Sequence, residues 1–131
     1  METNIYDDEY FKAQYEYILN NPYIVSRCLY HTPNFEEELE VIQPKKEETI
    51  VDVGCGLGQL PWLLSNSGVF TIGVDISRYA VTFAKKYYKN QHNEFLQMSA
   101  TFLGFRPNSM DAILLFHLLE HLTDEQLRDL L

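Results

Sequence analysis

The stretch Val51-Asp52-Val53-Gly54-Cys55-Gly56-Leu57-Gly58-Gln59 joins an apolar run and an acid to three glycines at alternate positions. This pattern is typical of a strand that runs directly into a glycine-rich turn at the start of a helix. Without Cβ atoms, Gly54 and Gly56 can adopt positive φ angles and let the backbone touch a ligand, and Gly58 permits close packing of the helix on the strand. The stretch therefore predicts a cradle for a small molecule.

Strand and helix patterns alternate along the rest of the chain from this turn. Short apolar runs predict strands over 49–53, 70–74, 94–98 and 111–116. Helical spacing predicts helices over 59–66 and 77–90 and a last helix that begins near Leu118. The last apolar run suits a strand buried on both faces. Strands that alternate with helices form a parallel sheet, so we expect an α/β fold.

The first third of the chain has helical patterns instead. Asp7 and Asp8 can cap a first helix that ends before Pro22, which opens a second one. A third helix is predicted from Thr32-Pro33 to Pro44, with Leu39 and Ile42 on one face. We expect a helical cap over residues 1–44 and the sheet-containing core over 45–131.

Composition and charge exclude several classes of protein. The chain has 131 residues, enough for one domain, and a net charge of −9 that would repel the phosphates of a nucleic acid. No apolar run approaches the roughly 20 residues that cross a bilayer. The amino terminus is acidic, unlike a secretory signal, so a cytoplasmic location is expected. The two cysteines, Cys28 and Cys55, match no disulfide framework or paired metal motif and are expected to be reduced.

The residues after the glycines narrow the class of ligand. A dinucleotide fingerprint G-x-G-x-x-G needs glycine where Gln59 stands, and no Gly-Lys-Ser/Thr of a P-loop is present. Asp75 ends the second predicted strand, where an acid can accept hydrogen bonds from both ribose hydroxyls of nicotinamide or adenosyl ligands alike. Asp75 could instead cap the helix that begins near Ser77. Taken alone, Asp75 does not choose between these ligands.

Three segments in order resemble the class I S-adenosylmethionine-dependent methyltransferases. The acid and G-x-G-x-G of residues 52–58 match the first motif of the family, Asp75 matches the second, and residues 108–122 match the fourth strand and the helix entry. The resemblance covers about residues 45–131 and is nearest to the branch that acts on small molecules. It implies a Rossmann-like doubly wound sheet of order 3-2-1-4, S-adenosylmethionine as cofactor and a small-molecule methyl acceptor.

The resemblance also assigns roles to residues. Gly54, Cys55 and Gly56 would line the methionine moiety, and Asp52 would support its amino group. Asp75 would hold the ribose and Ile76 would pack on adenine. Ser99 stands where many members carry an acid near the adenine amino group, so its hydroxyl and the backbone of Ala100 would serve the ring instead. The predicted cofactor-binding set is Asp52, Gly54, Cys55, Gly56, Asp75, Ile76, Ser99, Ala100 and Phe116, and no catalytic residue is assigned.

Other patterns compete with this interpretation. His117, Glu120 and His121 satisfy the zinc-peptidase pattern H-x-x-E-H, but too few residues remain after them for a third ligand, and we predict no metal. His117 is also the nearest candidate for a general base, although an ordinary crevice or core histidine is favoured. Four tyrosines at positions 6, 10, 15 and 17 could form an aromatic lid over the sulfonium cation, or pack in the core.

The end of the chain bears on oligomeric state. Members of the resembled family continue to further strands, whereas this sequence stops after the fourth, so we expect a fragment. The open edge of that strand predicts a homodimer or a partner that covers it. Two alternative functions are a non-catalytic partner subunit that pairs through this edge and a nicotinamide-dependent oxidoreductase.

Overall fold

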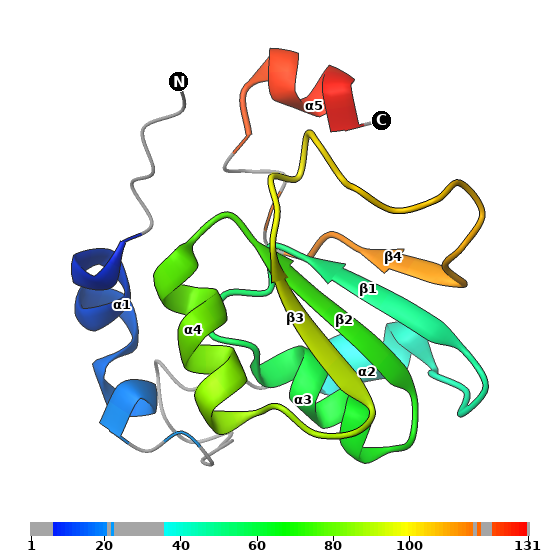
Figure 1. The fold of residues 1–131 in the computed structure, drawn as a ribbon, viewed down its shortest axis with the longest axis horizontal. Helices are drawn as coiled ribbons and strands as arrows, with labels where there is room; N and C mark the ends of the chain where they lie inside the picture. The colour runs from blue at the N-terminus through cyan, green and yellow to red at the C-terminus, as the bar shows by residue number, and fades with distance from the viewer. Residues whose placement is uncertain (1–6, 21, 23–35, 117, 119–121, 131) are drawn as a thin grey trace.

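A computed structural model of the chain describes residues 7–20, 22, 36–116, 118 and 122–130. Among these residues, four parallel strands form one sheet of order β3-β2-β1-β4 (Figure 1). The strands are β1 Thr49–Val53, β2 Phe70–Asp75, β3 Asn93–Gln97 and β4 Ala112–Leu114. The helices are α1 Asp8–Asn20, α2 Glu36–Ile42, α3 Gln59–Asn66, α4 Arg78–Tyr87 and α5 Asp124–Leu130. The predicted α/β fold and the strand order 3-2-1-4 are confirmed.

The strand register brings the carboxyl ends of three strands to one edge of the sheet. Val53 pairs with Val74, and Asp75 pairs with Gln97. The glycine turn, Asp75 and the residues after β3 therefore leave the sheet side by side. This is the edge at which open parallel sheets bind ligands.

The two faces of the sheet are covered by different parts of the chain. On one face, Ile50 packs with Leu60 and Leu64 of α3, and α2 adds Leu39 and Ile42. On the other face, Val51, Val53 and Val74 pack against the connection between β3 and β4. Figure 1 shows this connection across the sheet from α3 and α4. The glycine turn begins where β1 leaves this two-sided core.

The fourth strand differs from the prediction. β4 spans only residues 112–114 instead of 111–116, and Ile113 is 55% exposed. The expectation that this strand is buried on both faces is therefore wrong. An apolar composition predicts burial, but it does not show that a strand lies at the edge of the sheet. Among the described residues, β4 has no neighbouring strand on its outer side. Asp111 instead joins the start of β1, because its carboxylate accepts the Thr49 N–H at 2.7 Å and its own N–H donates to the Thr49 carbonyl at 2.9 Å.

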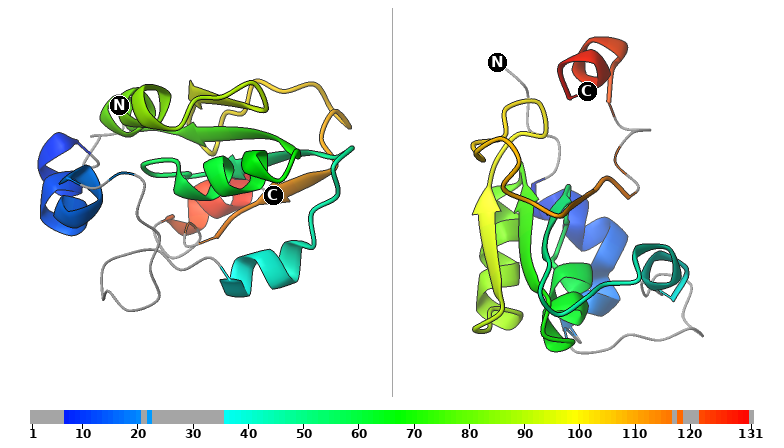
Figure 2. Two further views of the ribbon diagram at one scale, coloured as in Figure 1. Left: turned by 90° about the horizontal axis from the view of Figure 1, so that it is seen from below. Right: turned by 90° about the vertical axis from the view of Figure 1, so that its right-hand side faces the viewer.

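Helix boundaries also differ in detail. α4 begins after Ser77, whose hydroxyl accepts the Ala80 N–H at 3.2 Å and caps the helix. Leu118 lies in a turn, and α5 begins only at Asp124. α5 contains no buried residue and lies apart from the strands in Figure 1 and in the right-hand view of Figure 2. The predicted start of the third helix at 32–33 and the helix opened by Pro22 fall on residues outside the described part.

A polar cluster ties the opposite edge of the sheet together. The buried Asn93 side chain donates to Ser65 Oγ at 3.1 Å and to the Tyr88 carbonyl at 2.8 Å. Asn90 donates to the same Ser65 oxygen at 2.9 Å. These bonds link the ends of α3 and α4 to the start of β3, so the two helices that flank the glycine turn are anchored at their far ends.

Among the helices of the described part, none is long and apolar enough to cross a membrane.

Candidate cofactor site at the carboxyl edge of the sheet

The glycine turn has the conformation that its sequence predicts. Gly54, Gly56 and Gly58 have φ angles of 76°, 58° and 97°. The N–H groups of Gly54 and Cys55 donate to the Val74 carbonyl at 2.8 and 2.9 Å, which fastens the turn to the end of β2. Only glycine adopts such angles without strain, so all three positions depend on the missing Cβ.

The three glycines serve different purposes. A Cβ on Gly58 would lie 2.7 Å from Ala84 Cβ and 2.9 Å from Phe95 Cε1, so this glycine permits close packing against α4 and β3. A Cβ on Gly54 would lie 3.0 Å from Leu118 Cδ1. A Cβ on Gly56 would meet nothing within 4 Å. Gly58 is therefore a packing glycine, whereas Gly56 leaves an open approach to the backbone.

Asp75 connects the turn to the second strand. Its carboxylate accepts the Gly56 N–H at 2.9 Å and the Ser77 N–H at 2.8 Å. Burial raises the pKa of Asp75, and these two hydrogen bonds oppose that shift. Each oxygen thus accepts one backbone bond and keeps capacity for another. The helix cap is Ser77, so the alternative role of Asp75 as the cap of α4 is wrong.

Asp52 is a second buried carboxyl at this edge. Its residue is 4% exposed, and burial together with the charge of Asp75 raises the pKa of Asp52 to about 8. Burial and the same two carboxyls raise the pKa of the Cys55 thiol well above its ordinary value. Burial and like charge disfavour the ionised carboxylate of Asp52, and a cation placed here would oppose both effects by favouring the ionised form.

The remaining predicted residues are distributed around this centre. The Ile76 carbonyl accepts the Gln97 side chain at 3.0 Å, and the Met98 N–H donates to the Asp75 carbonyl at 3.1 Å. The Ser99 hydroxyl lies 3.0 Å from that of Thr101. Ala100 packs against the cluster of Val51, Val53 and Val74. These residues come after β2 and β3 at the edge where the glycine turn leaves β1.

Phe116 is placed differently from the other predicted cofactor contacts. Its half-buried side chain packs with the cluster formed by Ile50, Leu60 and Leu64. The structure therefore gives Phe116 a packing role on the α3 face of the sheet. Its predicted contact with the cofactor stays a prediction.

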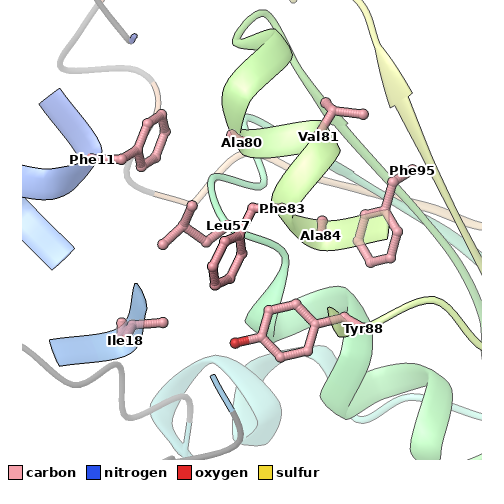
Figure 3. Packing of buried hydrophobic residues seen from close by; sticks show 9 residues of the cluster. All are labelled: Phe11, Ile18, Leu57, Ala80, Val81, Phe83, Ala84, Tyr88 and Phe95. Atoms are coloured by element: carbon pink, nitrogen blue, oxygen red, sulfur yellow. The ribbon is translucent and has the colours of Figure 1, made fainter. Parts of the chain in front are cut away.

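Helix α1 brings aromatic side chains to the same region. Phe11 stacks on Tyr79 of α4 with ring centroids 5.9 Å apart, and its centroid lies 5.8 Å from that of Tyr15. Figure 3 shows Phe11 and Ile18 on the side of α1 that faces Leu57 of the glycine turn. Burial, and after it the charge of Asp75, raises the pKa of Tyr15. Tyr15 therefore stands near the site, while Tyr6 and the side chain of Tyr17 lie outside the described residues.

Two residues at the site could not be assigned from the sequence. Leu118 lies over Gly54 and belongs to the core cluster behind the turn. Gln59, the first residue of α3, is 5% exposed, and its amide Nε2 has no hydrogen-bond partner among the described residues. In the sequence, Gln59 is only a departure from the dinucleotide fingerprint. A long-range contact and a missing partner are both invisible in a linear pattern.

The histidines of the zinc-peptidase pattern lie outside the described part of the structure. His117, Glu120 and His121, the residues of the zinc-peptidase pattern, all fall on positions that it does not describe. Among the described residues, no group of three or more His, Cys, Asp or Glu side chains could hold a metal ion. The cluster of Arg78, Lys85, Lys86 and Lys89 is exposed on and after α4, as expected for a solvated helix face.

Comparison with known proteins defines the class of this fold and site. Residues 51–130 match the methyltransferase domain family, so the chain belongs to that family. The fold is also that of a TehB-like S-adenosylmethionine-dependent methyltransferase from Corynebacterium glutamicum, with a TM-score of 0.69 at 15% identity over 93% of this chain and 61% of that one. S-adenosylmethionine is the methyl donor of this class.

Two curated relatives are similar to parts of the chain. A ubiquinone biosynthesis O-methyltransferase from Nitrosomonas europaea is 31% identical over 88 residues, which are 65% of this chain and 37% of the relative. A ribosomal RNA small subunit methyltransferase A from Syntrophus aciditrophicus is 28% identical over 101 residues, 63% of this chain and 36% of the relative. The chain thus spans little more than a third of the length of these two relatives.

Proposed function

We propose that this chain binds S-adenosylmethionine at the carboxyl edge of β1, β2 and β3 and carries the cofactor-binding portion of an enzyme that methylates a small molecule. The observation that supports this most directly is the open face of Gly56, whose N–H donates to the buried carboxylate of Asp75. A backbone that a ligand can approach closely, beside acids that favour a cation, fits the amino-acid end of the cofactor. The same proposal includes a boundary after residue 44, between the helical cap and the cofactor-binding core, and a cytoplasmic location.

The fit to the cofactor rests on the donor and acceptor groups present. Asp75 has acceptor capacity left after its bonds to Gly56 and Ser77, enough for the ribose hydroxyls. Asp52 would accept the amino group, and Ile76 would offer an apolar surface to adenine. The bound cofactor supplies an electrophilic methyl group on a sulfonium. The residues of this chain bind and orient that group and exclude water from it, a large part of what an in-line displacement requires.

A small-molecule acceptor is favoured by charge and by size. The net charge of −9 opposes binding to a polyanion. An open hollow of about 330 Å³ lies between residues 100–103 and the end of α5, where Asp129 and Leu130 line it, and a small acceptor could approach there. The name of the second relative suggests a nucleic acid as the alternative acceptor. Activity on RNA but not on small molecules would establish that alternative.

The open edge of β4 supports a further part of the proposal. The strand has a neighbour on one side only among the described residues, and Ile113 on it is 55% exposed. Such an edge invites pairing with another strand. We expect a second copy or a partner chain to cover it, and light scattering that shows a monomer at all concentrations would argue against a homodimer.

The decisive experiment is calorimetric titration of the chain with S-adenosylmethionine and its demethylated product. Asp75→Ala should weaken binding by about 10- to 100-fold, because a charge-assisted hydrogen bond contributes roughly 1.5–3 kcal/mol. Glu125→Ala, which removes an exposed acid on α5, is the matched control and should bind as the wild type does. Equal affinities of the wild type and Asp75→Ala would refute the assigned role of Asp75, and no binding to the wild type would refute the proposed function.

A further inference from the structure

The glycine turn has an acidic side and an electropositive side. Asp52 and Asp75 provide the acidic side, both of them buried. The other side is the amino terminus of α3, whose aligned peptide dipoles place partial positive charge at its first turn. An α-amino acid carries an ammonium and a carboxylate on the same carbon. The two sides of the turn therefore match the two charges of such a group.

The amino terminus of α3 lacks the usual internal caps. Gly58 occupies the N-cap position and has no side chain to accept a hydrogen bond from the first turn. Pro61, in the first turn, has no N–H, so Gln59 and Leu60 are the first-turn residues that can offer a backbone N–H to an acceptor. The first backbone N–H groups of a helix have no partner within the helix itself. This end of α3 is therefore suited to an acceptor from outside the helix.

Gln59 adds a side-chain donor to this helix end. Its residue is 5% exposed, and its Nε2 is the buried side-chain atom without a hydrogen-bond partner among the described residues. Because side chains in a helix lean toward its amino terminus, we expect the amide of this first residue at the end next to the turn. A buried amide donor without a partner is unfavourable, and native proteins rarely retain one without a reason.

We propose that the Gln59 side-chain amide donates a hydrogen bond to the carboxylate of the methionine moiety, with the amino terminus of α3 reinforcing it. The inference rests on the proposed function, because the ligand that brings the carboxylate is S-adenosylmethionine. It assigns to Gln59 the selection of cofactors that carry an amino acid over nucleosides that lack one. Gln59 is a binding residue in this scheme and takes no part in the chemical step.

The test compares two ligands that differ only in the amino-acid end. S-adenosylhomocysteine carries the carboxylate and the ammonium, and 5′-methylthioadenosine carries neither. Gln59→Leu should weaken S-adenosylhomocysteine binding by about 10-fold in calorimetry, because a hydrogen bond to a charged group is lost. Its affinity for 5′-methylthioadenosine should stay within about twofold of the wild-type value, since that ligand offers no carboxylate to lose. Gln59→Glu, with the same shape but an added negative charge, should weaken S-adenosylhomocysteine binding further.

Controls separate this role from a structural one. Removal of an unpartnered buried amide should leave the melting temperature of the ligand-free protein unchanged or higher in Gln59→Leu, and Gln59→Met replaces it if the leucine variant does not fold. Gln91→Leu, at an exposed position on the far edge of the sheet, should bind both ligands as the wild type does. Asp75→Ala should weaken both ligands, because both carry the ribose.

The outcomes distinguish this inference from the proposed function. Equal losses for the two ligands in Gln59→Leu, or no loss for S-adenosylhomocysteine, would overturn the carboxylate role while the cofactor site stands. A wild-type protein that binds neither ligand would overturn both.

Discussion

Replacement of Asp52 by asparagine should make the protein more stable at alkaline pH. Asp52 is 4% exposed, and its pKa is raised from 3.8 to about 8 by burial and by the charge of Asp75. Between these two values the folded protein holds a proton that the unfolded chain has lost. The contribution of Asp52 is therefore fully present below the unfolded value of 3.8 and is lost as the pH rises toward 8.

The size of this effect can be worked out from the pKa difference. Each pH unit between the two pKa values removes about 1.4 kcal/mol from the free energy of unfolding. Roughly three units, from about pH 5 to about pH 8, give about 4 kcal/mol, which relaxation of the fold around the ionised Asp52 reduces toward about 2 kcal/mol. An asparagine resembles the protonated carboxyl in shape and charge, so Asp52→Asn should match the wild type near pH 5 and exceed it by roughly 2 to 4 kcal/mol at about pH 8.

Urea unfolding of both proteins at several pH values across this range measures the difference. In a second pair of proteins that both carry Asp75→Asn, the pH dependence should shrink, because the second cause of the Asp52 shift is removed. Glu125→Gln, exposed on α5, serves as the control for the loss of a surface charge. A stability difference between wild type and Asp52→Asn that stays constant across this pH range would show that Asp52 is not held protonated by its surroundings.

Three further outcomes are expected. Gly58→Ala should lower the free energy of unfolding in urea by roughly 2 to 5 kcal/mol, because φ at this position is 97° and the new Cβ would lie 2.7 Å from another side chain. Gly56→Ala should lower it by only about 1 to 2 kcal/mol, yet weaken S-adenosylhomocysteine binding at least ~10-fold. Asn93→Ala should cost about 2 to 4 kcal/mol by breaking a buried polar cluster, and unchanged stability would contradict that cluster's role. Phe11→Ala, at a 3% exposed position, should cost about 3 to 5 kcal/mol and make α1 sensitive to proteolysis, and a protected α1 would show that other contacts hold this helix.

The glycine turn could be predicted from the sequence because its constraints are local. Alternate glycines after an apolar strand allow positive φ angles, and an acid on the next strand lies near them once the strands pair in parallel. The observed hydrogen bond between Gly56 and Asp75 is the direct result, at 2.9 Å. The same reasoning located β1, α3, β2 and β3 to within a few residues.

The fourth strand and the last helix could not be predicted in the same way. The apolar run that contains Ile113 indicates burial, but a sequence does not say which neighbour supplies it. Here the far edge of the strand has no neighbouring strand among the described residues, and Ile113 is 55% exposed. Leu118 was predicted to begin a helix, yet it lies in a turn where its side chain covers Gly54. Its position depends on this contact between distant parts of the chain, which no local pattern records.

Stability and binding make opposite demands on the residues around Gly56. A buried carboxyl at position 52 and an unpartnered amide at position 59 both disfavour the ligand-free fold. An apolar or neutral residue at either place would stabilise that fold and remove a group that the ammonium or the carboxylate of the cofactor needs. At both positions we therefore expect a variant that is more stable without ligand and binds the amino-acid end of the cofactor less well. The reason is the same in both cases, because the polar group that destabilises the ligand-free fold is also the group that pairs with the cofactor.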